Sequence, residues 1–144
     1  MKHMPSLVKY LLIILVVIMF SCDKSIFSVN CSGCTKDEPK TAEISISLND
    51  ISSSIYGEVV VSVYSGNLED NILLTTFIAN SADQATTVTL NKKYTFTATY
   101  QINGTSYTTV DAIFPRTKYE KSVCKDPCYY IFDNKVNLQL KYTK

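Results

Sequence analysis

From about residue 42 onward, apolar and polar residues alternate with a period of two, which is typical of half-buried β-strands. The clearest alternating positions in the first part are Ile44, Ile46, Leu48, Val59, Val61 and Val63. Residues 72–78 and 85–90 are predicted to form a third and a fourth strand. No amphipathic helix of useful length interrupts the series, so the pattern predicts an all-β domain.

The strongest local signal is Asn103-Gly104, which follows an alternating segment over residues 94–102. Asn-Gly favours a two-residue type I′ turn, because both turn positions need positive φ. The segment 105–114 is therefore predicted to be the partner strand of a hairpin.

A strict two-residue turn pairs Tyr100 with Tyr107 and Phe96 with Asp111. The same register places Val110 on the face that carries the threonines of the first strand. Either both faces of this hairpin are partly covered, or a bulge shifts the register.

Asp133-Asn134 is predicted to turn a second hairpin, between residues 129–132 and an alternating segment that contains Val136, Leu138 and Leu140. Seven or eight short strands in about 100 residues favour an antiparallel β-sandwich. The segment from Leu90 to Ala98, with Tyr94 in its middle, resembles the tyrosine-corner strand of fibronectin type III domains. The resemblance implies immunoglobulin-like topology, and a transthyretin-like arrangement is the alternative.

The first 22 residues form a different unit, with basic residues (Lys2, Lys9), an apolar run over 10–20, and Ser21-Cys22. This order is typical of an export signal. The apolar run is shorter than the roughly 20 residues that a spanning helix needs. A transmembrane anchor, or a conventional signal peptide with a coincidental cysteine, is the alternative.

The run Met19-Phe20-Ser21-Cys22 resembles the lipobox of bacterial lipoproteins, and the chain is similar to small Bacteroidota lipoproteins. The resemblance implies cleavage after residue 21 and attachment of lipid to Cys22, with acyl chains such as palmitate holding the protein in a membrane. It places the protein in the cell envelope, with the outer membrane as the expected location and the leaflet open. Three regions follow: a signal peptide (1–21), a polar tether with a CxxC motif (22–41) and the β-domain (42–144).

Charge and composition exclude several functions. Loss of residues 1–21 removes two of the 14 basic residues and none of the 13 acidic ones, which leaves a mature charge of −1. A nearly neutral chain without a basic cluster argues against nucleic-acid binding. The single histidine, His3, is lost with the signal, so no imidazole remains for Ser-His-Asp or Cys-His catalysis or for a His-ligated zinc hydrolase.

The carboxylates give no stronger evidence of catalysis. Glu69-Asp70 is predicted to lie in a solvated turn rather than to act as a glycosidase pair. Asp111 lies within a predicted strand and is interpreted as an exposed or hydrogen-bonded residue. We expect no enzymatic activity and no cofactor.

Four cysteines remain after lipidation: Cys31, Cys34, Cys124 and Cys128. In an exported domain, an even number favours two disulfides. Counting six antiparallel strands from residue 42 to residue 114 brings the loop 115–128 to the end of the sandwich where the tether enters. Bridges between the two cysteine pairs are therefore favoured over local ones. A structural Cys₄ zinc site, a redox-active CxxC and reduced thiols are the alternatives.

Three tyrosines near the cysteine loop, Tyr119, Tyr129 and Tyr130, could form a binding patch, whereas Tyr94 and Tyr100 are assigned to the core. The sequence thus predicts a membrane-tethered, non-catalytic module that binds or supports an envelope protein. A carbohydrate-binding accessory lipoprotein and a zinc-stabilised Cys₄ module are the alternatives.

Overall fold

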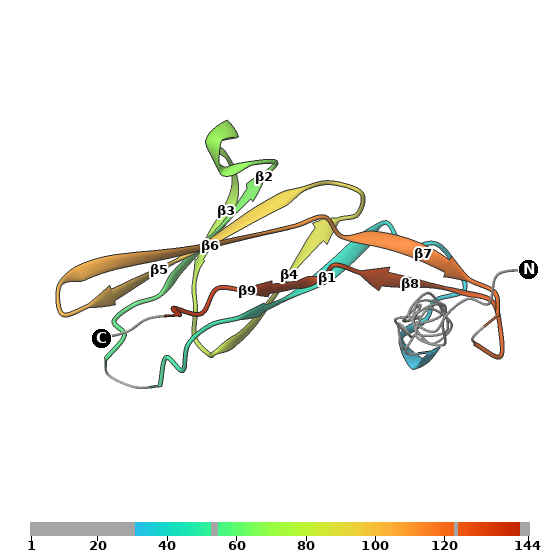
Figure 1. Cartoon of the computed structure of the whole chain (residues 1–144), viewed down its shortest axis with the longest axis horizontal. Coiled ribbons are helices and arrows are strands. Elements are labelled where there is room, and N and C mark those ends of the chain that lie inside the picture. Colours follow the sequence, from blue (N-terminus) through green and yellow to red (C-terminus); the bar gives the residue numbers. More distant parts are fainter. Residues whose placement is uncertain (1–30, 53–54, 123, 142–144) are drawn as a thin grey trace, which may run out of the picture.

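The part of the chain that the structure describes contains nine strands, most of which carry the predicted alternation of apolar and polar residues (Figure 1). A computed structural model describes residues 31–52, 55–122 and 124–141. The strands are β1 (Thr41–Ser47), β2 (Val60–Ser65), β3 (Ile72–Ile78), β4 (Asp83–Thr89), β5 (Tyr94–Ile102), β6 (Thr105–Ile113), β7 (Arg116–Glu120), β8 (Cys128–Phe132) and β9 (Lys135–Asn137). Two 3₁₀ turns, η1 (Cys31–Gly33) and η2 (Leu68–Asp70), are the helical elements of these residues.

The strands form three sheets, with the orders β4-β1-β9, β3-β2-β5-β6 and β7-β8. All pairings are antiparallel except that of β1 with β9. The predicted all-β architecture, with antiparallel sheets consistent with a β-sandwich, is confirmed. The strand number exceeds the expected seven or eight. One additional strand is β7, which lies in a segment that the sequence assigned to a loop.

The core lies between the three-stranded and four-stranded sheets and is built from the alternating residues of β1, β2 and β5. On β1, every second side chain is buried and those between face solvent. The buried hydrophobic cluster comprises Ala42, Ile44, Ile46, Leu48, Val59, Val61, Val63, Ala79, Val88, Leu90, Tyr94, Phe96, Ala98, Tyr100, Ile113, Val136 and Leu138. The prediction that Tyr94 and Tyr100 belong to the core is confirmed.

The β5–β6 hairpin has the register that a strict two-residue turn predicts. Asn103 and Gly104 have φ values of 50° and 78°, and Tyr100 pairs with Tyr107. Both faces are partly covered, because Thr95 is buried on the outer face and donates a hydrogen bond to the carbonyl of Gly66 (2.7 Å). The regular register therefore holds without a bulge.

The hydroxyl of Tyr94 donates a hydrogen bond to the backbone carbonyl of Thr89, five residues upstream (3.0 Å). A tyrosine corner makes a bond of this kind to backbone a few residues upstream. The contact fits the resemblance to fibronectin type III domains, while immunoglobulin-like topology stays a prediction.

Tyr100 connects the two large sheets. Its buried hydroxyl donates to the carbonyl of Leu138 (2.9 Å) and accepts from the amide of Asn49 (3.2 Å). Asn49 follows β1 and Leu138 follows β9, whereas Tyr100 lies on β5 of the opposite sheet. Burial raises the pKa of Tyr100 above its ordinary value, because the ionised form would lose its hydration.

The prediction of a hairpin at Asp133-Asn134 is wrong. β8 pairs with β7, and β9 pairs in parallel with β1 in another sheet. The carboxylate of Asp133 accepts a hydrogen bond from the amide of Phe114 (2.6 Å), and the carbonyl of Asn134 accepts one from the amide of Ser45 (3.0 Å). These bonds hold the connection between β8, in the β7-β8 sheet, and β9, in the β4-β1-β9 sheet. Asp133 lies in the left-handed region (φ 58°).

Candidate functional site: the cysteine end

We use the name cysteine end for residues 31–38, β7, β8 and the loop between these two strands. In Figure 1 the β7–β8 hairpin lies at one end of the long axis, and the turn between β5 and β6 lies at the other. The four cysteines predicted to form disulfides and the three tyrosines predicted to form a binding patch all belong to the cysteine end.

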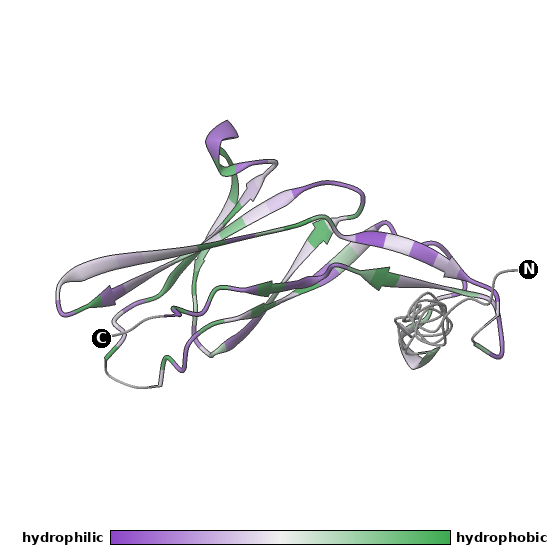
Figure 2. Cartoon of the chain, viewed as in Figure 1, coloured by the Kyte–Doolittle hydropathy of each residue, from purple (hydrophilic) through white to green (hydrophobic). Residues whose placement is uncertain are grey.

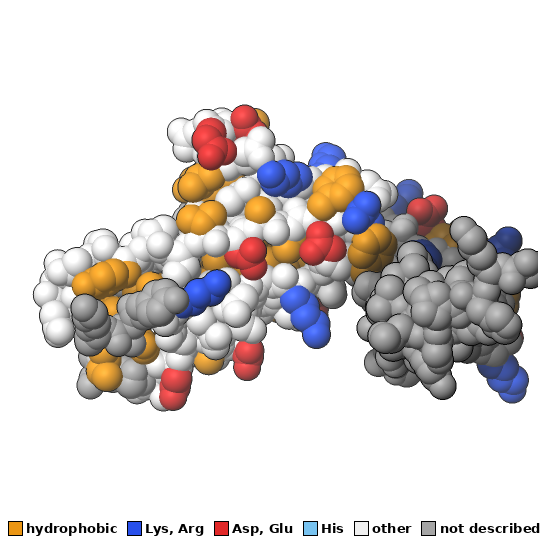
Figure 3. All heavy atoms as spheres, in the orientation of Figure 1, with side chains coloured by type: hydrophobic (Ala, Val, Ile, Leu, Met, Phe, Trp, Pro, Cys, Tyr) orange, Lys and Arg blue, Asp and Glu red, His pale blue; other side chains and the backbone are white. Residues whose placement is uncertain are grey.

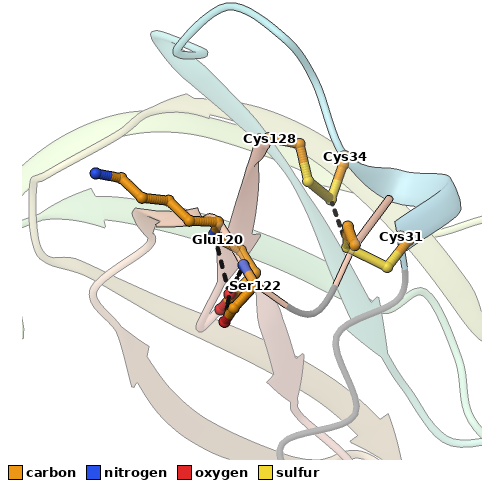
Figure 4. Close-up of a disulfide and its surroundings, with 7 residues drawn as sticks. Cys31, Cys34, Glu120, Ser122 and Cys128 are labelled. Atoms are coloured by element: carbon orange, nitrogen blue, oxygen red, sulfur yellow. Dashed lines mark hydrogen bonds between the residues drawn. A yellow bond between two sulfur atoms is a disulfide. The ribbon is translucent and has the colours of Figure 1, made fainter. Parts of the chain in front are cut away.

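The four cysteines come together from two distant segments (Figure 4). Cys31 is bonded to Cys124 (S–S 2.12 Å, Cα–Cα 5.6 Å) and Cys34 to Cys128 (S–S 2.26 Å, Cα–Cα 5.4 Å). Cys31 starts η1, Cys124 lies in the β7–β8 loop and Cys128 starts β8. The structure thus has the pairing between segments that strand counting favours.

The sulfur atoms form one compact cluster. The Sγ atoms of Cys34, Cys124 and Cys128 lie within 4.8 Å of one another, and those of Cys34 and Cys124 are 3.9 Å apart. A Cys₄ zinc site would use the same residues, since tetrahedral thiolate ligation needs four converging sulfurs. Two disulfides and a metal are mutually exclusive here, because bonding all four sulfurs in disulfides leaves no thiolate to act as a ligand.

Backbone and side-chain bonds hold the segment after the cysteines against the hairpin. Thr35 and Tyr129 exchange two backbone hydrogen bonds (2.9 and 2.8 Å), which adds a one-residue strand contact to β8. The hydroxyl of Thr117 donates to the carboxylate of Glu38 (3.1 Å). The later half of the predicted tether is therefore part of the folded domain.

The β7–β8 loop is ordered by an acidic side chain at its start. Glu120 accepts hydrogen bonds from the amides of Lys121 (3.0 Å) and Ser122 (2.8 Å) and from the Ser122 hydroxyl (2.8 Å), as seen in Figure 4. A carboxylate that accepts from successive amides closes a turn in the way that an Asx or N-cap residue does. The turn leads the chain toward Cys124.

The three predicted patch tyrosines lie on two faces of the hairpin. Tyr119 pairs with Tyr129 across the strands, and their ring centroids are 4.8 Å apart. Tyr130 pairs instead with Lys118, one position along the ladder and therefore on the opposite face. The structure brings Tyr119 and Tyr129 together and separates Tyr130 from them.

A cationic and aromatic contact that sequence reasoning missed occupies the face of Tyr130. The guanidinium carbon of Arg116 lies 4.8 Å from the ring centroid of Phe132 and 5.2 Å from that of Phe114. Distances of this size are typical of cation–π contacts. The pairing of Arg116 with Phe132 could have been found only if β7 had been predicted as a strand.

The candidate carboxylates have structural partners. One oxygen of Asp111 accepts from the amide of Asn137 (2.9 Å), and the other accepts from the amide of Ala112 (2.9 Å). Asp70 accepts from the amide of Asn67 (2.9 Å) at the start of η2. Asp111 thus joins β6 to β9, in agreement with its interpretation as a hydrogen-bonded strand residue.

Cys22 and His3 lie outside the described residues. Within residues 31–52, 55–122 and 124–141, no helix has the length and apolar character needed to cross a membrane. No protein-family model, curated protein or solved structure matches the chain. The function is therefore inferred from the residues and their geometry.

Proposed function

We propose that the protein is a bacterial envelope lipoprotein, anchored through Cys22, whose β-domain is a non-catalytic binding or structural module. The observation that carries this proposal is the pair of disulfides between residues 31–34 and the β7–β8 loop. Disulfides form and persist in oxidising compartments outside the cytosol. They support the interpretation of residues 1–21 as an export signal.

The disulfides also define how far the domain can lie from the lipid. Between Cys22 and Cys31 there are only eight residues, which allow roughly 30 Å when fully extended. The cysteine end would therefore face the membrane. Because the β5–β6 turn lies at the opposite end of the long axis, it would point away (Figure 1).

The non-catalytic part of the proposal rests on the mature sequence and on the carboxylates. No histidine follows residue 21, so general-base chemistry of the Ser-His-Asp kind has no imidazole. Asp111 and Asp70 accept backbone hydrogen bonds in the fold. A binding or support role in the envelope needs none of these groups.

Substitution of Cys22→Ser tests the anchor. We expect the wild-type protein in the membrane fraction. We expect the Cys22→Ser variant either in the soluble fraction or still carrying its uncleaved signal peptide. The reason is that each buried acyl CH₂ contributes about 0.8 kcal/mol to membrane binding. Fractionation by ultracentrifugation after a high-salt wash measures the change.

The matched control for this experiment is Ser25→Ala, which lies beyond the expected processing site and should leave the wild-type distribution unchanged. An identical membrane fraction for wild type and Cys22→Ser, with the same N-terminus, would refute lipid anchoring through this residue.

Carbohydrate binding is the second candidate, and the stacked pair of Tyr119 and Tyr129 favours it. Tyr119 is exposed and its ring lies against that of Tyr129, and tyrosine offers an apolar face together with a hydroxyl. A glycan array with wild type and Tyr119→Ala separates this candidate from a protein-binding module.

A further inference from the structure

The sulfur atoms of the cysteine end have nearly the spacing that a tetrahedral metal site needs. Thiolate sulfurs bind Zn²⁺ at about 2.3 Å, so neighbouring sulfurs of a tetrahedral site lie about 3.8 Å apart. The Sγ atoms of Cys34 and Cys124, which are not bonded to each other, are 3.9 Å apart. Those of Cys34, Cys124 and Cys128 all lie within 4.8 Å of one another. Reduction of the two disulfides would therefore leave four sulfurs around one point that a metal ion can occupy (Figure 4).

Both cysteine pairs also have the sequence spacing of zinc ligands. Two residues separate Cys31 from Cys34, and three separate Cys124 from Cys128. Pairs separated by two to four residues are typical of structural zinc sites. The first pair is folded by η1, since the amide of Cys34 donates a hydrogen bond to the carbonyl of Cys31 (3.4 Å). Each segment thus supplies two sulfurs to the same cluster.

Contacts that contain no sulfur hold the two cysteine segments side by side. Thr35 and Tyr129 exchange backbone hydrogen bonds of 2.9 and 2.8 Å, and Thr117 donates to Glu38 (3.1 Å). Reduction of the bridges removes none of these groups. A metal ion would therefore bind to a site that the backbone partly assembles, and its binding free energy would stabilise the fold.

The charge of the cysteine end suits a thiolate cluster. Its residues, 31–38 and 116–132, include five cationic and four acidic side chains. Lys36, Lys121 and Lys125 each lie within three residues of a cysteine, and Figure 3 shows Lys and Arg side chains at this end of the molecule. Cations beside a cysteine favour its thiolate, which is the form that binds metal. They also offset the net charge of about −2 that four thiolates and one Zn²⁺ carry together.

We propose that the reduced cysteine end binds one Zn²⁺ ion through the thiolates of Cys31, Cys34, Cys124 and Cys128, so that metal and disulfides are alternative redox forms of one cluster. A dithiol or phosphine reductant delivers two electrons to each disulfide, and four protons complete the four thiols. Zinc then displaces these four protons. Loss of four electrons to an oxidant, such as another disulfide, re-forms both bridges and releases the ion.

The disulfide form belongs to the oxidising compartment of the proposed function, and the zinc form belongs to reducing conditions. Zinc binding by the reduced protein does not depend on the lipid anchor. A failure of the zinc experiment therefore leaves the Cys22→Ser experiment unaffected, and the reverse also holds.

Zinc loading of the full-length, detergent-solubilised protein tests the proposal. The protein is reduced with a phosphine, mixed with Zn²⁺ and desalted, and the retained metal is measured by elemental mass spectrometry. We expect one zinc ion per chain for reduced wild type and for the control Ser122→Ala, and none for oxidised wild type. For the double variant Cys34→Ser/Cys128→Ser we expect the zinc affinity to fall about 100-fold or more. Two of the four ligands are lost, and loss of an outer partner alone costs about 10- to 100-fold.

Thermal unfolding distinguishes a folded site from zinc bound to unfolded cysteines. Zinc should raise the melting temperature of reduced wild type by about 10 °C or more and leave that of the reduced double variant nearly unchanged. Absence of zinc from reduced wild type would overturn the proposal. So would equal zinc binding by the double variant, equal binding by oxidised protein, or a wild-type melting temperature that zinc does not change.

Discussion

Removal of one disulfide is expected to cost about 2–3 kcal/mol of unfolding free energy, whereas removal of both should cost about 7 kcal/mol. The first variant replaces Cys34 and Cys128 by serine, the second replaces Cys31 and Cys124, and the third replaces all four. A loss of about 7 kcal/mol is comparable with the whole stability of many domains. We therefore expect the four-serine variant to be largely unfolded at 37 °C.

Removing the first disulfide costs less unfolding free energy than removing the second, because of where the two bridges lie in the sequence. Each bridge spans 93 or 94 residues, and in the chain-entropy model a single loop of that size contributes about 4.7 kcal/mol. When one bridge is already present, the second bridge closes only a small additional loop. That loop consists of residues 31–34 and 124–128. A loop of roughly ten residues contributes about 2.6 kcal/mol in the same model.

Guanidinium unfolding of the full chain without reductant measures the three values. Ser122→Ala, in the same loop but without a sulfur, is the control and should change stability by less than about 1 kcal/mol. Equal losses for a two-serine variant and the four-serine variant would contradict two parallel long-range bridges, because the second bridge would then add nothing.

Truncation of Tyr100 is the other change with a large expected effect. Tyr100→Ala should lower the unfolding free energy by about 3–5 kcal/mol, the range for large buried aromatic residues. Tyr100→Phe should cost about 1–2 kcal/mol, because it leaves the amide of Asn49 without this acceptor and removes the donor to Leu138. Tyr107→Ala is the control, since Tyr107 pairs with Tyr100 across the hairpin but is 44% exposed.

The same residue predicts a loss of stability at alkaline pH. Burial raises the pKa of Tyr100 in the folded state, whereas an unfolded tyrosine ionises near pH 10. Above about pH 10 the unfolded chain therefore binds fewer protons than the folded one, and the unfolding free energy falls as pH rises. Urea unfolding between pH 8 and 11 should show a steeper fall for wild type than for Tyr100→Phe. Parallel pH profiles would contradict this assignment.

Much of the sandwich could be predicted because its central strands carry regular alternation. Residues 44, 46 and 48 on and after β1, and 96, 98 and 100 on β5, are buried as their period of two indicates. The Asn103-Gly104 turn fixed the register of the hairpin, since both positions need positive φ.

Strand β7 and the β8–β9 connection could not be predicted from local signals. Arg116-Thr-Lys-Tyr-Glu120 has no apolar alternation, and Figure 2 shows β7 as largely hydrophilic beside a more hydrophobic β8. Its extended form depends on pairing with β8, the other strand of the same hairpin, rather than on an apolar pattern of its own. Asp133 has positive φ, as a hairpin turn requires, but its hydrogen bond to Phe114 directs the chain elsewhere.

The meeting of the cysteine segments could be predicted from the sequence, but the arrangement of the tyrosines could not. Counting strands brings the two cysteine segments to one end of the domain. The faces of Tyr119, Tyr129 and Tyr130 depend on the register of β7 with β8, which the sequence does not reveal.

The most direct test of the proposed anchored, disulfide-bonded module is the intact mass of the membrane-extracted protein under non-reducing conditions. We expect a chain that starts at Cys22, carries two or three acyl chains and gains four mass units on full reduction. A chain that retains residues 1–21, or begins elsewhere without lipid, would contradict the anchor. No mass change on reduction, or a bound zinc ion lost with chelator, would contradict the disulfides.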